Sequence, residues 1–280
     1  MPRLVPLAPL TALALVPLAC GGGSGAADVA NAAAKTSTGS YAVSMITSMD
    51  LPSLNQPVAI KAAGVFDSKT RRGRLALDLS ELSNATGQNL GSAVMVLEGT
   101  NIYMRLPFLH RANPRLKPWL KINLQQAARA QGVDFSSFLQ LGQGGDPTQS
   151  LEYLRGAGHV KKLGKAQVRG VETTQYRTTI DLAKVPDQAP KKARPELRKS
   201  IKRVIRLTGQ KTIPAEVWID HQGRARRMVY RQKFLIANQR LNSAVSMDIY
   251  DFGTNVAVSP PPASEVTDLT KLTAPPQGSG

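Results

Sequence analysis

From residue 40 to residue 252, apolar and polar positions alternate along much of the chain with a period of two. The clearest example runs from Val58 to Leu79, where two alternating segments flank a polar turn at residues 68–73. Such alternation is typical of β-strands with one apolar face and one polar face. It predicts strands over residues 41–49, 58–66, 75–79, 93–97, 102–106, 119–124, 159–163, 171–182, 213–220, 226–236 and 243–252.

Helical patterns interrupt this meander at a few places. Helices are predicted over residues 26–35, 124–130, 135–141, 147–154 and 194–207. The fold class is therefore α+β, built mainly on an antiparallel sheet. These helices carry too little apolar surface to cover about ten strands, so we expect a strongly curved, open half-barrel. Its helices should cover the concave face and leave an apolar cavity. A sheet folded on itself as a sandwich is the alternative.

Ten inward-facing apolar positions are candidates for the lining of this cavity. Half of them are methionines, whose unbranched and flexible side chains suit acyl chains of variable length. Ordinary core packing explains each position equally well when it is taken alone. The candidates are Met45, Ile60, Leu75, Leu77, Met95, Ile102, Met104, Val217, Met228 and Met247.

The N-terminus has the order of an export signal. Arg3 is followed by the apolar run Leu4–Leu18 and then by Cys20, the single cysteine of the chain. This order resembles a bacterial lipobox, in which the cysteine receives a diacylglycerol and becomes the first residue of the mature protein. Pro17 stands where that motif usually has leucine. The alternatives are a signal peptide cut at Ala19 without lipidation, and a retained membrane helix, for which the run is short.

Composition divides the rest of the chain. We expect a signal peptide over residues 1–19, a flexible tether over 20–39, one domain over 40–258 and a proline-rich, disordered tail over 259–280. Because no cysteine follows Cys20, the domain forms no internal disulfide and depends on burial for its stability.

The formal net charge is +17. For an exported protein the available polyanions are lipid headgroups and wall polymers, so we expect an anionic membrane surface as partner and no nucleic acid. A basic surface that only confers solubility is the alternative. The densest run of charge is the helix predicted at 194–207, with Leu197, Ile201, Val204 and Ile205 on its apolar face. Its candidates for contact with headgroups are Arg198, Lys199, Lys202, Arg203 and Arg206.

Residues that carry catalysis or bind metals form no recognisable pattern. The three histidines lie in separate segments, and a metal site needs three or four converging ligands. Asp248 and Asp251 are the nearest approach to an acid–base pair. The glycine-rich segment 142–145 lacks the Gly-Lys-Ser/Thr of a phosphate-binding loop. We expect no enzyme activity, no cofactor and no metal.

Three stretches resemble the LppX/LprG lipoproteins of actinobacteria, whose wider architecture is that of the LolA/LolB lipoprotein carriers. They are Gly164–Tyr176, Pro214–Asp220 and Arg226–Met228. The resemblance implies a LolA-like half-barrel. It also implies a carrier without catalysis that binds a lipid or glycolipid at the outer face of the cytoplasmic membrane.

The leading hypothesis is therefore a lipid-anchored, monomeric protein that binds an acyl chain in an apolar cavity. A second hypothesis is a sensor or interaction protein of the cell envelope, with a filled core and a protein or wall partner. An enzyme is the third.

Overall fold

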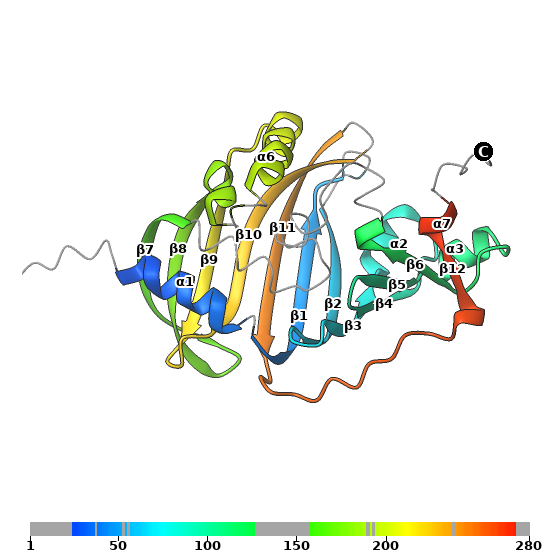
Figure 1. Ribbon diagram of the computed structural model, residues 1–280, viewed down its shortest axis with the longest axis horizontal. Coiled ribbons are helices and arrows are strands. Elements are labelled where there is room, and N and C mark those ends of the chain that lie inside the picture. The colour runs from blue at the N-terminus through cyan, green and yellow to red at the C-terminus, as the bar shows by residue number, and fades with distance from the viewer. Residues whose placement is uncertain are drawn as a thin grey trace, which may run out of the picture.

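The computed structural model describes residues 24–36, 38–51, 54, 57–126, 157–188, 191, 194–236 and 239–272. In this part of the chain, twelve strands form a single curved sheet (Figure 1). Every predicted strand is present, with its ends shifted by a few residues. In chain order the strands are β1 (Ser40–Met49), β2 (Val58–Asp67), β3 (Arg72–Asp78), β4 (Ser92–Glu98), β5 (Asn101–Arg105), β6 (Trp119–Asn123), β7 (Ala157–Val168), β8 (Val171–Asp181), β9 (Thr212–Asp220), β10 (Ala225–Ile236), β11 (Gln239–Tyr250) and β12 (Val266–Asp268).

The strand order shows that two meanders share this sheet. β1 to β6 follow one another on one side, β7 to β11 on the other, and the groups meet where β1 pairs antiparallel with β11. β12 alone adds in parallel, beside β6. β7 and β12 form the two edges, so the described sheet is open. The predicted fold class, an α+β protein built on an open antiparallel half-barrel, is confirmed.

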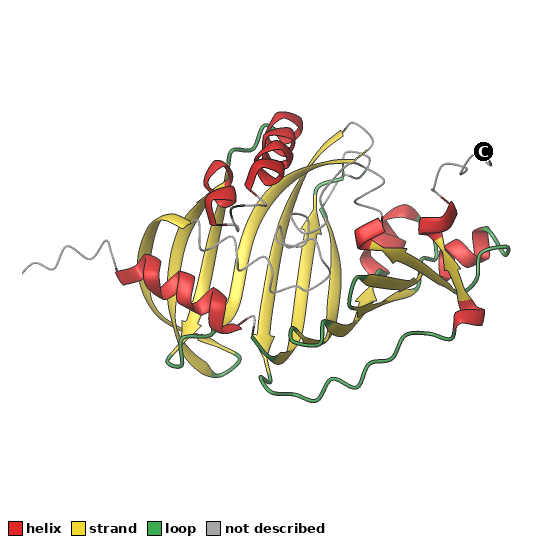
Figure 2. Cartoon of the chain, viewed as in Figure 1, coloured by secondary structure: helices red, strands yellow, loops and turns green. Residues whose placement is uncertain are grey.

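Two helices cover one face of the sheet (Figure 2). This face bears Met45, Met228 and Met247, and is called the inner face below. The helices α1 (Ser24–Thr36) and α6 (Arg194–Thr208) contribute to the same hydrophobic cluster as these methionines. The other described helices are α2 (Ser80–Thr86), α3 (Pro107–Ala112), η2 (Leu182–Gln188), η3 (Ala263–Glu265) and α7 (Leu269–Leu272).

Not all of the helices matched the sequence pattern. α6 forms as predicted, whereas α2 and α3 were missed because each is too short for a helical period to repeat. The helices predicted at 124–130, 135–141 and 147–154 lie outside the described residues, except for the helical residues 124–126.

The flexible tether predicted over residues 20–39 is wrong for residues 24–36, where the helix predicted at 26–35 is confirmed. They form α1, which packs on β7, β9 and β10. Val29, Ala32 and Ala33 have no exposed surface. The small side chains that made this segment look like a spacer let the helix approach the sheet closely. It is therefore part of the folded domain.

The predicted disordered tail is also wrong up to residue 272. After Tyr250 the chain runs along the bottom of the view in Figure 1 and reaches the far edge of the sheet, where Val266–Asp268 pairs with β6. Lys121 Nζ lies 3.3 Å from the carboxylate of Asp268, and Thr270 Oγ1 accepts a hydrogen bond from the N–H of Asn123. The prolines of this segment precede β12, so they do not interrupt its pairing. Residues 273–280 lie outside the described residues.

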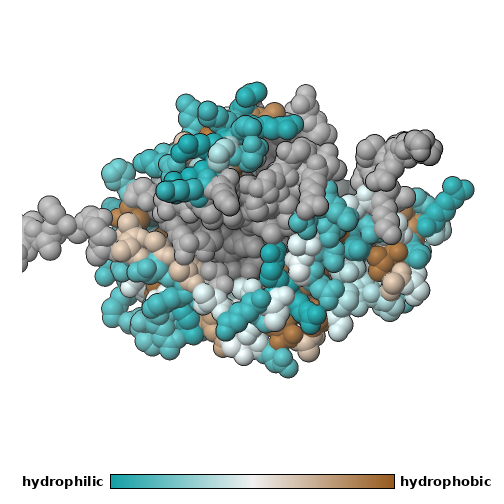
Figure 3. Space-filling view, in the orientation of Figure 1, coloured by the Kyte–Doolittle hydropathy of each residue, from teal (hydrophilic) through white to brown (hydrophobic). Residues whose placement is uncertain are grey.

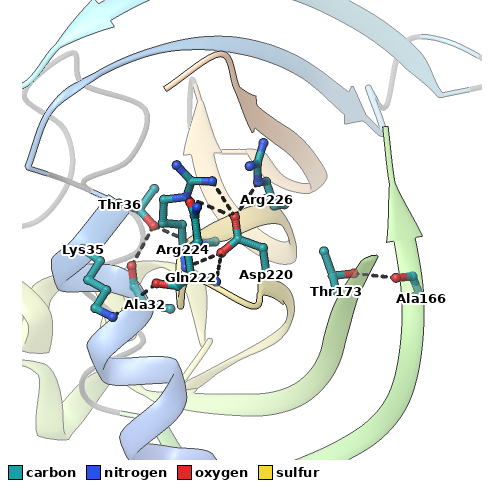
Figure 4. A network of polar contacts seen from close by, with 10 residues as sticks. Ala32, Lys35, Thr36, Ala166, Thr173, Asp220, Gln222, Arg224 and Arg226 are labelled. Carbon is teal, nitrogen blue, oxygen red and sulfur yellow. Dashed lines mark hydrogen bonds and ion pairs between the residues drawn. The ribbon is translucent and has the colours of Figure 1, made fainter. Parts of the chain in front are cut away.

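A buried carboxylate orders the turn between β9 and β10, next to the end of α1 (Figure 4). The side chain of Asp220 is fully buried and accepts hydrogen bonds from Nε of Arg224 at 3.1 Å and of Arg226 at 2.8 Å. The N–H of Ala225 donates to Thr36 Oγ1 at 2.8 Å, which ties α1 to this turn. Burial by itself raises the pKa of Asp220, but hydrogen bonds from Arg224 and Arg226 outweigh it and hold the pKa below its usual value.

We predict that Asp220→Asn lowers the free energy of unfolding by about 3 kcal/mol near neutral pH, because two arginines lose their buried partner. A carboxylate whose pKa is lowered by folding loses its stabilising effect as the pH falls through that pKa. The difference between wild type and variant should therefore shrink below about pH 4. Urea unfolding at neutral and at acid pH measures this difference in the free energy of unfolding. A difference that does not depend on pH contradicts the stabilising role of the ionised Asp220.

Candidate functional site

Strand register places all ten apolar candidates on the inner face. One row of opposing residues crosses six neighbouring strands, in the order Val217, Met228, Met247, Met45, Ala62 and Leu77. A second row crosses β3, β4 and β5 in the order Leu75, Met95 and Met104. Ile60 and Ile102 lie on the same face, because they are paired with Thr47 and Leu97.

Burial of this face falls from one side of the sheet to the other. On β9, β10 and β11 the three candidates Val217, Met228 and Met247 are at most 1% exposed. On β1 to β5, one candidate, Leu75, is also buried. The rest are only partly buried, namely Met45, Ile60, Leu77, Met95, Ile102 and Met104. The candidates on β9–β11 are therefore part of a closed core, whereas six of those on β1–β5 are only partly buried, beside Tyr41, Val43, Phe66 and Leu97, which are almost completely buried on the same face.

α6 presents a basic outer surface, seen at the top of Figure 3 as a largely hydrophilic region. All five predicted cations are exposed. Arg198 pairs with Asp187 at 2.6 Å, and Lys199 with Glu196 at 2.8 Å. Within the described residues the remaining three, Lys202, Arg203 and Arg206, have no ion pair.

Two exposed apolar side chains of α6, Val204 and Leu207, lie among these cations. Leu197 and Ile201 of α6 are buried, as predicted. Val204, predicted on the same apolar face, is 39% exposed, and Leu207 is 42% exposed. Val204 lies one turn beyond Ile201, so its exposure shows that the rest of the fold does not cover this part of the helix. The outer surface of α6 is thus basic and partly apolar.

Three arginines of the β9–β10 hairpin, Arg224, Arg226 and Arg227, have structural partners and do not extend this surface. Arg224 and Arg226 bind Asp220, as described above. Arg227 binds Asp248 through two hydrogen bonds, Nε to Oδ1 at 2.5 Å and Nη2 to Oδ2 at 2.8 Å. Arg169 binds the same carboxylate at 3.2 Å. These cations stabilise the fold.

A pocket of about 710 Å³ lies beside the end of α6, and we call it the rim pocket. Sequence analysis did not predict it, because its residues come from segments with no shared motif. It is lined by Ser48, Asp50, Pro57, Gly209, Gln210, Lys211, Thr212, Pro214, Arg231, Gln232, Lys233, Asn242, Ser243 and Ala244.

The acid–base candidates do not converge. Both carboxylate oxygens of Asp248 are occupied by Arg227, and Asp251 is an exposed residue with a positive φ of 47° after β11. In the described part of the chain, no group of three or more His, Cys, Asp and Glu side chains is placed to hold a metal ion. Among the described helices, none has both the length and the apolar character needed to cross a membrane.

No family model matches the chain. At 26% identity over 161 residues, the chain is similar to an uncharacterized 31.2 kDa protein from the rplA–rplJ intergenic region of Streptomyces griseus. The alignment covers 58% of this chain and about half, 51%, of that protein.

Two solved structures align with most of this chain at low sequence identity. The lipoprotein LppX of Mycobacterium tuberculosis aligns with 84% of this chain and 98% of its own, at a TM-score of 0.47 and 16% identity. LprF of Mycobacterium bovis aligns with 85% and 97%, at a TM-score of 0.43 and 11% identity. Similarity at this level identifies no ligand.

We predict that Arg227 stabilises the fold and that Lys202, Arg203 and Arg206 of α6 do not. Arg227→Ala should lower the free energy of unfolding by about 1 to 2 kcal/mol, because Asp248 loses its two-fold hydrogen bonding. The triple change Lys202→Ala, Arg203→Ala and Arg206→Ala should leave the free energy of unfolding within about 0.5 kcal/mol, because these exposed cations have no ion pair with any described residue. Chemical denaturation compares the three proteins. A large loss in the triple variant would mean that α6 needs its charges in order to fold.

Proposed function

We propose that the protein binds the acyl chain of a lipid or glycolipid against its inner face and acts as a carrier without catalysis. The observation that carries this proposal is the apolar inner face, where six of the candidates on β1–β5 are only partly buried while those on β9–β11 are packed. Monomeric proteins rarely leave contiguous apolar surface uncovered unless it has a binding role. Flexible side chains such as Met45, Met95 and Met104 adapt to chains of different shape.

The energetics allow such binding without a covalent step. Each methylene moved from water to an apolar site contributes about 0.8 kcal/mol, so a palmitoyl chain contributes on the order of 10 kcal/mol before ordering costs. Transfer then consists of docking to the membrane, exposure of the inner face and partition of the chain.

We further propose that Cys20 is lipidated and anchors the protein at the outer face of the cytoplasmic membrane. α1 begins at Ser24, so the chain between these two residues spans at most about 15 Å in any conformation. The anchor would hold the start of α1 close to the bilayer. The basic surface of α6 supports an anionic leaflet as partner, and we propose a monomer that binds no nucleic acid.

A filled core, as expected of an envelope sensor or interaction protein, makes a different prediction from a lipid site. Met45→Trp adds volume at a partly buried position of the inner face. In a lipid carrier it should reduce co-purified lipid severalfold with little loss of stability, because the larger ring occupies space meant for the ligand. In a filled core it should cost about 1 to 3 kcal/mol by overpacking.

Ile46→Trp is the matched control, because Ile46 is the next residue, points to the opposite face and is 43% exposed. Lipid extraction and native mass spectrometry of the purified proteins give the lipid content. Wild-type protein without lipid, combined with a destabilised Met45→Trp variant, contradicts the carrier function.

We predict that the mature protein begins at Cys20 and carries the added mass of a diacylglycerol. Mass spectrometry of the protein isolated from membranes of a lipoprotein-processing bacterium measures this. Cys20→Ser should abolish the added mass and release the protein from the membrane anchor. An unmodified mature N-terminus at Cys20 would show export without lipidation.

A further inference from the structure

The rim pocket exists because β9 and β10 separate at one end of the sheet. Their pairing ends at Ala215 and Tyr230, while β10 continues to Ile236 beside β11. Pro214 lies one residue beyond this last pair and has no N–H to donate. The separation opens the pocket between the end of α6, the two strands and the neighbouring end of β1.

Gln210 holds the separated strand in place. Its side-chain amide donates to the carbonyl of Arg231 at 3.2 Å, and its side-chain oxygen accepts from the N–H of Lys233 at 2.6 Å. The side-chain amide of Gln210 thus makes the hydrogen bonds to β10 that a neighbouring strand would otherwise make at this point. Only the backbone groups of Arg231 and Lys233 take part, so their side chains make neither of these hydrogen bonds.

Three cations line the rim pocket, and none of them has an ion pair within the described residues. They are Lys211, Arg231 and Lys233, all of them exposed. The single acidic residue of the lining is Asp50, which accepts a hydrogen bond from Asn242 at 3.3 Å. The pocket therefore carries an excess of positive charge that the protein does not neutralise.

Ser243 is also among the lining residues, but the strand register places its side chain on the inner face, with Met247, whereas the side chains of Arg231 and Lys233 lie on the opposite face. Ser243 is 4% exposed, and its Oγ has no hydrogen-bond partner. This hydroxyl therefore does not add to recognition of a ligand by these two cations. Asn242, opposite Lys233 on the same face as these cations, adds a polar side chain to a lining suited to an oxygen-rich anion.

The surroundings of the pocket favour a lipid as the source of that anion. Gly209, Gln210 and Lys211 follow directly on α6, whose exposed Val204 and Leu207 stand among unpaired cations. Apolar side chains next to basic ones are typical of surfaces that lie at the headgroup level of an anionic membrane.

We infer that the rim pocket binds the phosphate-bearing headgroup of an anionic membrane lipid, through Lys211, Arg231 and Lys233. An arginine offers paired N–H donors to phosphate oxygens, and lysines add charge at adaptable positions. The inference rests on the proposed carrier function for its lipid source, but the site itself is independent of the inner face.

The test compares two triple variants in the full chain carrying Cys20→Ser. The pocket variant has Lys211→Ala, Arg231→Ala and Lys233→Ala. The control has Arg74→Ala, Lys117→Ala and Lys161→Ala, which remove the same charge from exposed residues outside the pocket. Binding is measured by co-sedimentation with phosphatidylcholine vesicles with and without phosphatidylglycerol. The N-terminal apolar run is common to all proteins, so its contribution cancels.

We expect the pocket variant to lose affinity for phosphatidylglycerol vesicles by tenfold or more, and the control variant by less than about threefold. Equal losses would overturn the site, since they would show general attraction of charge. Circular dichroism melting checks that both variants fold. If the pocket variant unfolds, the double change Lys211→Gln and Lys233→Gln replaces it, with an expected loss of about fivefold or more.

Calorimetric titration with inorganic phosphate separates the two sources of the anion. Weak phosphate binding, together with pocket-dependent vesicle binding, supports a lipid headgroup. Pocket-dependent phosphate binding without pocket-dependent vesicle binding overturns the lipid assignment. Failure of the carrier function is distinguishable, because it appears as absent co-purified lipid and an overpacked Met45→Trp variant, while vesicle binding still depends on the pocket.

Discussion

The pairing of β1 with β11 is the interaction on which the rest of the structure depends. It joins two meanders that would otherwise be separate sheets, each with an uncovered apolar face. It also aligns Met45 with Met247, which connects the partly buried candidates of β1–β5 to the packed ones of β9–β11. The paired strands are roughly 200 residues apart in the chain, so this contact closes a long loop. The lipid-binding proposal depends directly on the continuity that this pairing creates.

The positive charge of the protein serves two purposes, which the structure separates by their partners. Cations that face a carboxylate organise the fold: Arg224 and Arg226 at Asp220, and Arg227 at Asp248. Among the described residues, Lys202, Arg203 and Arg206 of α6 and the three cations of the rim pocket have no such partner, as is also true of scattered surface cations such as Arg74 and Lys161. Placing like charges together without counter-ions is unfavourable unless an external anion compensates them. The net charge alone does not distinguish these two groups.

The packing of α1 determines how far the domain would lie from the proposed anchor at Cys20. Its N-terminal half is tied to β8 by the hydroxyl of Tyr176, which donates to Asp28 at 3.0 Å, and its C-terminal end is tied to the β9–β10 turn through Thr36. A mature protein beginning at Cys20 would therefore have a short connection to the membrane instead of a long tether. The domain would then remain near the leaflet, on the side where α1 begins.

The sequence by itself determined the strands, their apolar faces, the amphipathic helix α6 and the open α+β class, because alternation and helical period are local properties of neighbouring residues. It also placed the ten apolar candidates correctly on one face. Only the tertiary structure decided that α1 belongs to the core, that residues 266–268 return to β6, and that Val204 stays exposed. The partners of the arginines and the rim pocket were likewise not predictable. Each of these depends on segments distant in the chain, whose mutual register no local pattern encodes.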